Sequence, residues 1–251
     1  MMKQFGILTF IASLLLSTQL AFASEQNFNI AIIQEWSSFN QVTSQLASNE
    51  AIFPFILRRM IKRTPDGSVL ADVAEQIPTL KKNTATWVIK KNAKWADGHT
   101  ITCADWHLGW QVGLNPKVSV DVKSNYQKIT KIEWNEKSPQ SCSVTYATID
   151  WTYDRDLPPL LPSHIEKSIY ENFKNEPEGY DRNTSYISTP TNKALYNGPY
   201  YVSEFKLGSH VILMRNEHFY GAKPKIQKII IKHISDTSAL KANLMAGQIN
   251  G

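Results

Sequence analysis

The sequence lacks the short patterns that mark most enzyme active sites. It contains no Gly-x-Ser-x-Gly segment, no His-Glu-x-x-His segment and no glycine-rich phosphate loop. Asp154 and Asp156 flank Arg155, which indicates an ion cluster on a loop and not a pair of catalytic acids. We therefore predict that the chain is not an enzyme and that it uses no cofactor.

A metal-binding pattern is also missing. The six histidines are scattered, and no two of them have the i, i+4 spacing that places two ligands on one helix face. His99 with His107, or His210 with His218, could still meet in space. Surface histidines without a ligand are the simpler interpretation, and the sequence predicts no metal site.

Long apolar runs are absent beyond the first residues. Lys3 precedes an apolar stretch from Phe5 to Leu16, which is shorter than the roughly 20 residues needed to span a bilayer. The small-x-small pattern at residues 21–23 then predicts a signal peptide over residues 1–23, cleaved after Ala23. No cysteine follows for lipid attachment, so we expect a periplasmic product; an uncleaved anchor is the alternative.

Cysteine is scarce, with Cys103 and Cys142 as the whole set. An even number of cysteines in an oxidising compartment favours a disulfide. Such a bond would close a loop of roughly 40 residues and stabilise the fold by about 4 kcal/mol on the chain-entropy model. Two buried thiols that never meet are the alternative.

A strong excess of one charge is missing too. The chain has 27 basic and 22 acidic residues, which are interspersed. The pairs Lys81-Lys82 and Lys90-Lys91 indicate solvated strand edges, so we predict no nucleic-acid partner. Tryptophan, in contrast, is frequent, with seven residues. Trp87 alternates into a predicted strand and Trp95 precedes a turn. Trp106 and Trp110 lie four apart on one predicted helix face, which favours the core.

Hydrophobic periodicity predicts a mixture of strands and helices in irregular order, which indicates an α+β fold. We expect helices over 49–63, 102–114, 163–173 and from 236 onward, and strands over 28–33, 86–90, 129–134, 143–148, 200–205, 210–215 and 228–234. A polar turn is expected around Ser138-Pro139. Residues 176–193 are polar and turn-rich, and we expect a long surface loop there.

Two of the predicted helices begin with a capping pattern. Thr102 is followed by Asp105, and Ser163 is followed by Glu166, three positions on in each case. In a capping box the first residue satisfies a free backbone N–H and the acidic residue faces the positive helix end. Asn115-Pro116 ends the first of these helices, and Gly247 is placed to end the last one.

Six short motifs occur along the chain in a specific order. They are Leu70-Ala-x-x-x-Glu75, Trp95-x-Asp-Gly98, Ala104-Asp-Trp106, Pro159-x-Leu-Pro-x-His164, Gly198-Pro-Tyr200 and Arg215-Asn-x-x-Phe-Tyr220. In this order the motifs resemble the extracellular solute-binding proteins of family 5, which serve peptide and nickel ABC importers.

The resemblance implies a periplasmic-binding-protein-like fold of type II. It assigns residues 24–50 and 196–251 to an incomplete α/β domain of the first lobe, and residues 51–195 to a satellite α+β domain on that lobe. The second lobe would follow residue 251. The chain is therefore expected to be an N-terminal fragment, a degenerate product, or a protein that works with one lobe.

The implied function is that of a periplasmic solute-binding component of an ABC importer, most often for peptides. Other branches of the family bind nickel, haem or sugars. The implied partners are a small solute and the permease at the inner membrane, and the expected state is a monomer. A periplasmic interaction module that has lost solute binding is the alternative.

The resemblance also suggests where this lobe meets the ligand. The loop Glu35-Trp36-Ser37-Ser38 sits where the family contacts the ligand backbone, and Tyr126 falls in a region whose aromatic side chains approach the cleft. An exposed loop without ligand contact is the alternative for each. The groups that hold the charged peptide ends lie largely in the second lobe, so we expect this chain alone to bind peptides weakly.

Overall fold

The computed structural model describes residues 27–44, 47–149 and 151–250. The predicted signal peptide, residues 1–23, lies outside the described residues. Within these ranges, no helix combines the length and the apolar character that crossing a membrane requires.

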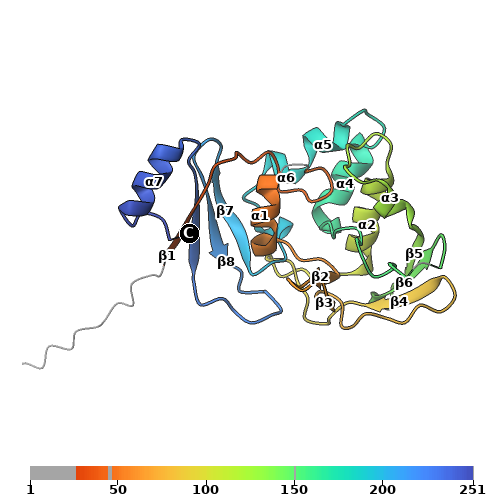
Figure 1. The fold of residues 1–251 in the computed structure, drawn as a ribbon. Coiled ribbons are helices and arrows are strands. Elements are labelled where there is room, and N and C mark those ends of the chain that lie inside the picture. Colours follow the sequence, from red (N-terminus) through yellow and green to blue (C-terminus); the bar gives the residue numbers. More distant parts are fainter. Residues whose placement is uncertain (1–26, 45–46, 150, 251) are drawn as a thin grey trace, which may run out of the picture.

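A four-stranded sheet joins the beginning of the described chain to its end (Figure 1). Its strand order is β1-β9-β8-β7, where β1 is Asn27–Ile32, β7 is Tyr200–Lys206, β8 is His210–Arg215 and β9 is Lys228–His233. β1 runs parallel to β9, and the other neighbours are antiparallel. Alternation along β9 buries Ile229 and Ile231, which confirms the period-two pattern in the sequence.

A second, three-stranded sheet has the order β4-β6-β5. Its strands are β4 (Thr84–Val88), β5 (Ile129–Asn135) and β6 (Ser138–Tyr146), and the helices nearby are α2 (Cys103–Leu114), α3 (Ser124–Gln127) and α4 (Ser163–Phe173). α2 packs on β5 and β6. Trp87 of β4 meets Trp106 of α2 edge to face at 5.8 Å, and both rings are fully buried, as predicted.

Smaller elements connect the two sheets (Figure 1). They are α1 (Ala47–Ile56), the hairpin β2 (Ile61–Arg63) and β3 (Val69–Ala71), α5 (Gly179–Asn183), α6 (Ser185–Ser188) and a 3-10 turn (Lys193–Leu195). The last helix, α7 (Thr237–Met245), follows β9 and lies at the end of the molecule opposite the three-stranded sheet (Figure 1). Most of the buried hydrophobic side chains form one cluster that includes residues of both sheets. The division into residues 24–50 with 196–251 and residues 51–195 stays a prediction.

Two helix boundaries follow the local signals in the sequence. The Asp105 carboxylate accepts the Thr102 backbone N–H at 2.8 Å and closes the capping box of α2, whose C-cap is Asn115. In α7, Asp236 accepts the Ala239 N–H at 2.6 Å, and Gly247 has the positive φ of a helix C-terminal glycine.

The predicted helix over 49–63 is wrong in its second half. α1 ends at Ile56 because the Asn197 side chain binds the backbone of Arg58, two residues later: its Oδ1 accepts the Arg58 N–H at 2.7 Å and its Nδ2 donates to the Arg58 carbonyl at 3.1 Å. The N–H groups of Asn197 and Gly198 also bond the Ile56 carbonyl. These tertiary bonds replace the helical ones, and the chain turns into β2.

The capping box predicted at Ser163 and Glu166 is also wrong. The N-cap of α4 is Pro162, and the Ser163 hydroxyl donates to Asp105 Oδ1 at 2.7 Å. Glu166 is fully buried and accepts the hydroxyls of Tyr180 and Thr184, each at 2.7 Å. The acidic side chain therefore serves the core and not the helix end.

The prediction of a long surface loop over residues 176–193 is wrong as well, and the hydrogen bonds of Glu166 explain why. This segment forms α5 and α6, and Tyr180 and Tyr186 are fully buried. The buried Glu166 carboxylate needs hydrogen-bond donors from within the fold. Tyr180 and Thr184 supply them, so this polar segment packs against the core and does not form a surface loop. The expected turn at Ser138-Pro139 lies earlier, at Glu136-Lys137, since β6 already begins at Ser138.

Candidate functional site

A cavity of about 500 Å³ opens where α1 gives way to β2. Its apolar lining includes Phe53, Leu57 and Leu157. Its charged lining consists of four basic residues, Arg58, Arg59, Lys62 and Arg63, and three acidic ones, Glu50, Asp72 and Asp156. A pocket with apolar walls and a few charged groups is the usual form of a small-ligand site.

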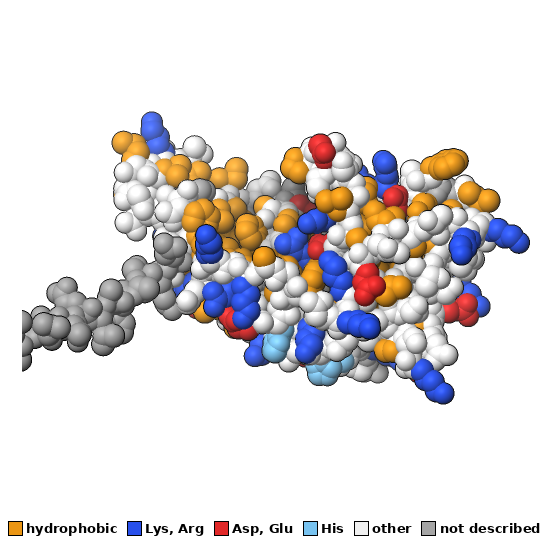
Figure 2. Space-filling view, turned by 90° about the horizontal axis from the view of Figure 1, so that it is seen from below, with side chains coloured by type: hydrophobic (Ala, Val, Ile, Leu, Met, Phe, Trp, Pro, Cys, Tyr) orange, Lys and Arg blue, Asp and Glu red, His pale blue; other side chains and the backbone are white. Residues whose placement is uncertain are grey.

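A second cavity of about 530 Å³ shares Arg58, Lys62 and Asp72 with the first and adds Lys90, Phe219 and Tyr220. We call the two cavities together the basic groove, because its basic side chains outnumber its acidic ones. Figure 2 shows Lys and Arg side chains spread over one face of the molecule, with hydrophobic side chains exposed between them.

The basic groove is held together by two of the sequence motifs. Asp72, from the motif that begins at Leu70, accepts the hydroxyl of Tyr220, from the motif that begins at Arg215, at 2.6 Å. Burial and the neighbouring Asp72 raise the pKa of Tyr220, so this hydroxyl remains a donor. Lys90 donates to the Asp72 carbonyl, and its ammonium lies 5.0 Å from the centre of the Tyr220 ring.

The arginines of the groove differ in how far they are neutralised. Arg58 lies 3.6 Å from Asp72 and 5.6 Å from the Phe219 ring, yet its buried Nε has no hydrogen-bond partner in the described chain. Arg63 pairs with Asp156 at 2.7 Å. Arg59 donates through Nε to Gln41, a neutral group, at 3.1 Å. Arg59 therefore keeps guanidinium donors that face no anion, and Asp72 neutralises Arg58 only in part.

The loop predicted to touch ligand is only partly at the surface. Trp36 is 2% exposed and packs edge-on against Phe205 and His233. Ser38 is also buried, and its Oγ accepts the Asn40 N–H at 3.1 Å. The side chains of Glu35 and Ser37 are exposed, so these two are the members of the loop that a solute can reach.

Tyr126 lies in a different part of the fold. It is 7% exposed in α3, and a Cβ built on Gly113 of α2 would lie 2.0 Å from its ring. The Trp110 indole N–H donates to the Tyr126 carbonyl at 3.1 Å. Gly113 lets α2 and α3 approach this closely, so the structure gives Tyr126 a packing role and does not bring it together with residues 35–38.

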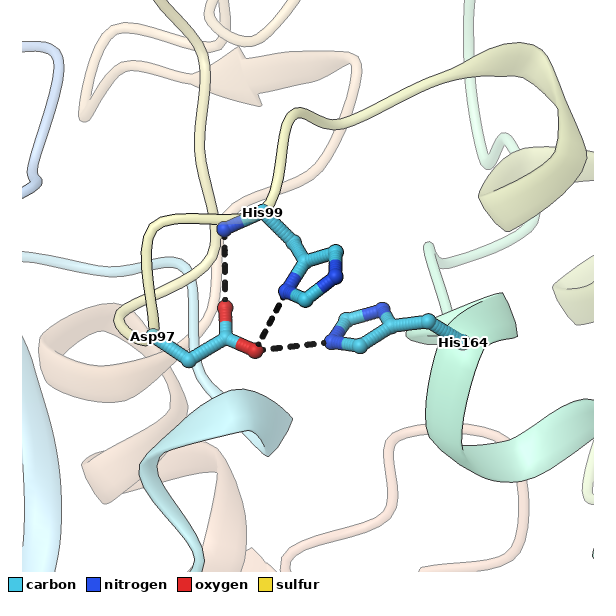
Figure 3. A group of neighbouring side chains, drawn as sticks. All are labelled: Asp97, His99 and His164. Atoms are coloured by element: carbon cyan, nitrogen blue, oxygen red, sulfur yellow. Dashed lines mark hydrogen bonds and ion pairs between the residues drawn. The ribbon is translucent and has the colours of Figure 1, made fainter.

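Three side chains that the sequence left apart form a cluster (Figure 3). Asp97 Oδ2 lies 2.8 Å from His99 Nδ1 and 3.0 Å from His164 Nε2, and the two imidazole rings stack with centres 4.1 Å apart. Asp97 Oδ1 accepts the His99 backbone N–H at 3.0 Å, in a turn completed by Gly98 at φ +96°. His164 arrives from the first turn of α4.

The cluster lowers the pKa of the Asp97 carboxyl and corrects an expectation about His99. Partial burial alone would raise the pKa of Asp97, but hydrogen bonds from the His99 backbone and from both imidazoles hold it below its usual value. His99 thus meets His164 and not His107, which packs against Trp110 and Trp134. His99 directly follows the motif that ends at Gly98, and His164 ends the motif that begins at Pro159. Membership of these motifs could have pointed to the two histidines, whereas the spacing between histidines in the sequence did not.

Comparison with known families settles the ancestry of the chain. The sequence model of the bacterial extracellular solute-binding proteins, family 5, matches residues 69–250. The chain belongs to this family. Family 5 proteins are binding proteins and not enzymes, and they act in the periplasm or outside the cell.

Two relatives have sequences that are similar to most of this chain. The oligopeptide-binding protein AppA of Bacillus subtilis is 25% identical over 223 residues, which cover 88% of the chain and 39% of AppA. The periplasmic murein peptide-binding protein MppA of Escherichia coli is 22% identical over 99% of the chain and 49% of MppA. The chain therefore spans about two-fifths to one-half of these relatives.

Solved structures show the same fold. AppA in complex with a nonapeptide superposes with a TM-score of 0.76 at 24% identity, over 89% of this chain and 43% of AppA. NikZ from Campylobacter jejuni, in complex with Ni(L-His), gives a TM-score of 0.74 at 24% identity, over 90% and 42% of the two chains. The described α+β arrangement is thus part of the family 5 fold.

Proposed function

We propose that this chain belongs to a periplasmic solute-binding component of an ABC importer and that its solute is a peptide. The match to family 5 over residues 69–250 carries the proposal, and the peptide-binding names of the relatives support the choice of solute. The proposed partners are the permease at the inner membrane and the peptide, with the binding protein as a monomer exported by cleavage after Ala23.

We place one contact with the solute in the basic groove. Arg58 and Arg59 offer guanidinium donors that no carboxylate fully occupies, beside apolar walls at Phe53 and Leu57. A carboxylate of the peptide would accept hydrogen bonds from these donors, since Arg binds carboxylates through paired N–H groups. Glu35 and Ser37 remain proposed contacts with the peptide backbone.

Titration with short peptides tests this proposal. We expect alanine tri- to pentapeptides with a free C-terminus to bind more tightly than the same peptides with an amidated C-terminus. Arg59→Gln should weaken binding of the free-acid peptides by roughly tenfold or more, because a charge-assisted hydrogen bond is worth about 1.5–3 kcal/mol. Lys137→Gln, on the turn between β5 and β6, is the matched control and should have no effect.

Affinity of this chain alone should be modest, because a solute covered on one side keeps much of its surface in water. The measurement therefore uses NMR at high peptide concentration, on this chain and on any longer product of the same reading frame. No response to any peptide would refute the peptide proposal. Equal binding of acid and amide peptides would refute the role of the basic groove and leave the rest standing.

A further inference from the structure

We propose that Asp97, His99 and His164 form a binding site for a divalent transition-metal ion, with Zn²⁺ as the first candidate. The cluster offers one carboxylate oxygen and two imidazole nitrogens, all within 4.8 Å of one another. It lies outside the lining of the basic groove, and the inference does not depend on peptide binding.

Two of the three distances between the ligand atoms are close to what zinc requires, and all three are below 4.8 Å. Zinc binds imidazole nitrogen and carboxylate oxygen at about 2.0–2.2 Å, so tetrahedral ligands lie about 3.3 Å apart. The two nitrogens lie 2.8 and 3.0 Å from Asp97 Oδ2, so an ion requires each contact to open by only a few tenths of an ångström. The His99 side chain is 62% exposed, so its ring can tilt to make room.

The proton balance of the site also permits metal binding. Both ring nitrogens that face Asp97 now serve as N–H donors to one oxygen. A neutral imidazole can carry its proton on either nitrogen, so each ring can move it to the outer nitrogen and present a lone pair to the ion. One divalent cation would then replace two hydrogen bonds, while Asp97 Oδ1 keeps the His99 backbone N–H.

The donor set selects the type of ion. Two imidazoles with one carboxylate suit zinc and its neighbours in the transition series, whereas magnesium and calcium prefer sites made of oxygen. Three protein ligands leave a fourth position for water. The thiolates of Cys103 and Cys142 cannot compete, because the two sulfurs are bonded to each other.

Calorimetry with ZnCl₂ on the purified chain, without a polyhistidine tag and after treatment with chelator, tests the site. We expect one Zn²⁺ per chain. His99→Ala, His164→Ala and Asp97→Asn should each weaken binding by roughly tenfold or more. His210→Ala is the matched control: His210 also lies 3.0 Å from a carboxylate, that of Glu204, but among the described residues this pair has no third ligand atom within 4.8 Å. Its binding should equal that of the unaltered chain.

A measurement on the unaltered chain keeps the test independent of how the variants fold. Zn²⁺ should shift the imidazole NMR signals of His99 and His164, and leave those of His107 and His210 in place. Absence of saturable Zn²⁺ binding, shifts at other histidines alone, or full binding by the folded His99→Ala variant would each overturn the proposal.

Discussion

At the scale of single residues, His107 links the stability of the fold to pH. The ring is half-buried between Trp110 and Trp134. Burial, assisted by the positive charge of Lys167, lowers the pKa of His107 below its ordinary value of 6.5. The unfolded chain therefore takes up this proton first as the pH falls, and protonation favours unfolding.

The expected result is a loss of stability from His107 that begins as the pH drops below about 6.5 and continues until the pH has passed the lowered pKa of the folded state. His107→Gln should remove this component, so the free energies of unfolding of the two proteins should differ by a pH-dependent amount within that window. Urea unfolding at several pH values from 8 to 5 measures it. A constant difference across that range would show that His107 does not titrate as argued.

At the scale of elements, the disulfide ties a helix to a sheet. Cys103 opens α2, Cys142 lies in β6, and their Cα atoms are 5.5 Å apart across a sequence separation of 39 residues. We predict that the exported protein carries this bond and that replacing both cysteines by alanine costs about 2–4 kcal/mol of unfolding free energy. The unfolded state of the variant gains the freedom that the closed loop removed.

Mass spectrometry without reductant and thermal unfolding measure this prediction. A reductant should lower the melting temperature of the unaltered chain and leave that of the double alanine variant unchanged. Alkylation of both thiols in native, unreduced protein would contradict the bond, and so would equal stability of the two proteins.

At the scale of the whole molecule, α7 leaves an apolar surface uncovered. None of its residues is buried, and Leu244 and Met245 are 49% and 80% exposed. The segment after α7 is fixed to β1, the edge strand of the larger sheet: the Asn250 side chain accepts the Asn29 N–H at 2.9 Å. Exposed apolar side chains beside a sheet edge favour self-association.

We predict that Leu244→Lys with Met245→Lys reduces association of this chain at high concentration, as measured by light scattering, without lowering its melting temperature. Ser235→Lys with Gln248→Lys adds the same charge at exposed polar positions and is the control. The apolar surface is not responsible if both double variants scatter equally, or if neither differs from the unaltered chain.

Where short-range chemistry is sufficient, the sequence by itself determined the structure. Alternation along residues 228–234 predicted β9, and Thr102, Asp105 and Asn115 set the limits of α2, because each signal acts within a few residues of where it stands. Trp106 and Trp110, four positions apart on one face of α2, are buried as their spacing predicted. The order of the motifs was enough to identify the family.

Only the tertiary structure decided where α1 ends, what Glu166 does and which histidines meet. Asn197 reaches Arg58 across 139 positions, and Asp97 reaches His164 across 67. The candidate site follows the same rule. The resemblance pointed to the loop of Trp36 and to Tyr126, whose side chains are buried in this fold, whereas the basic groove brings Tyr220 to Asp72 from 148 positions away. Hydrogen bonds of this range depend on the packing of the whole chain, which no local pattern of residues encodes.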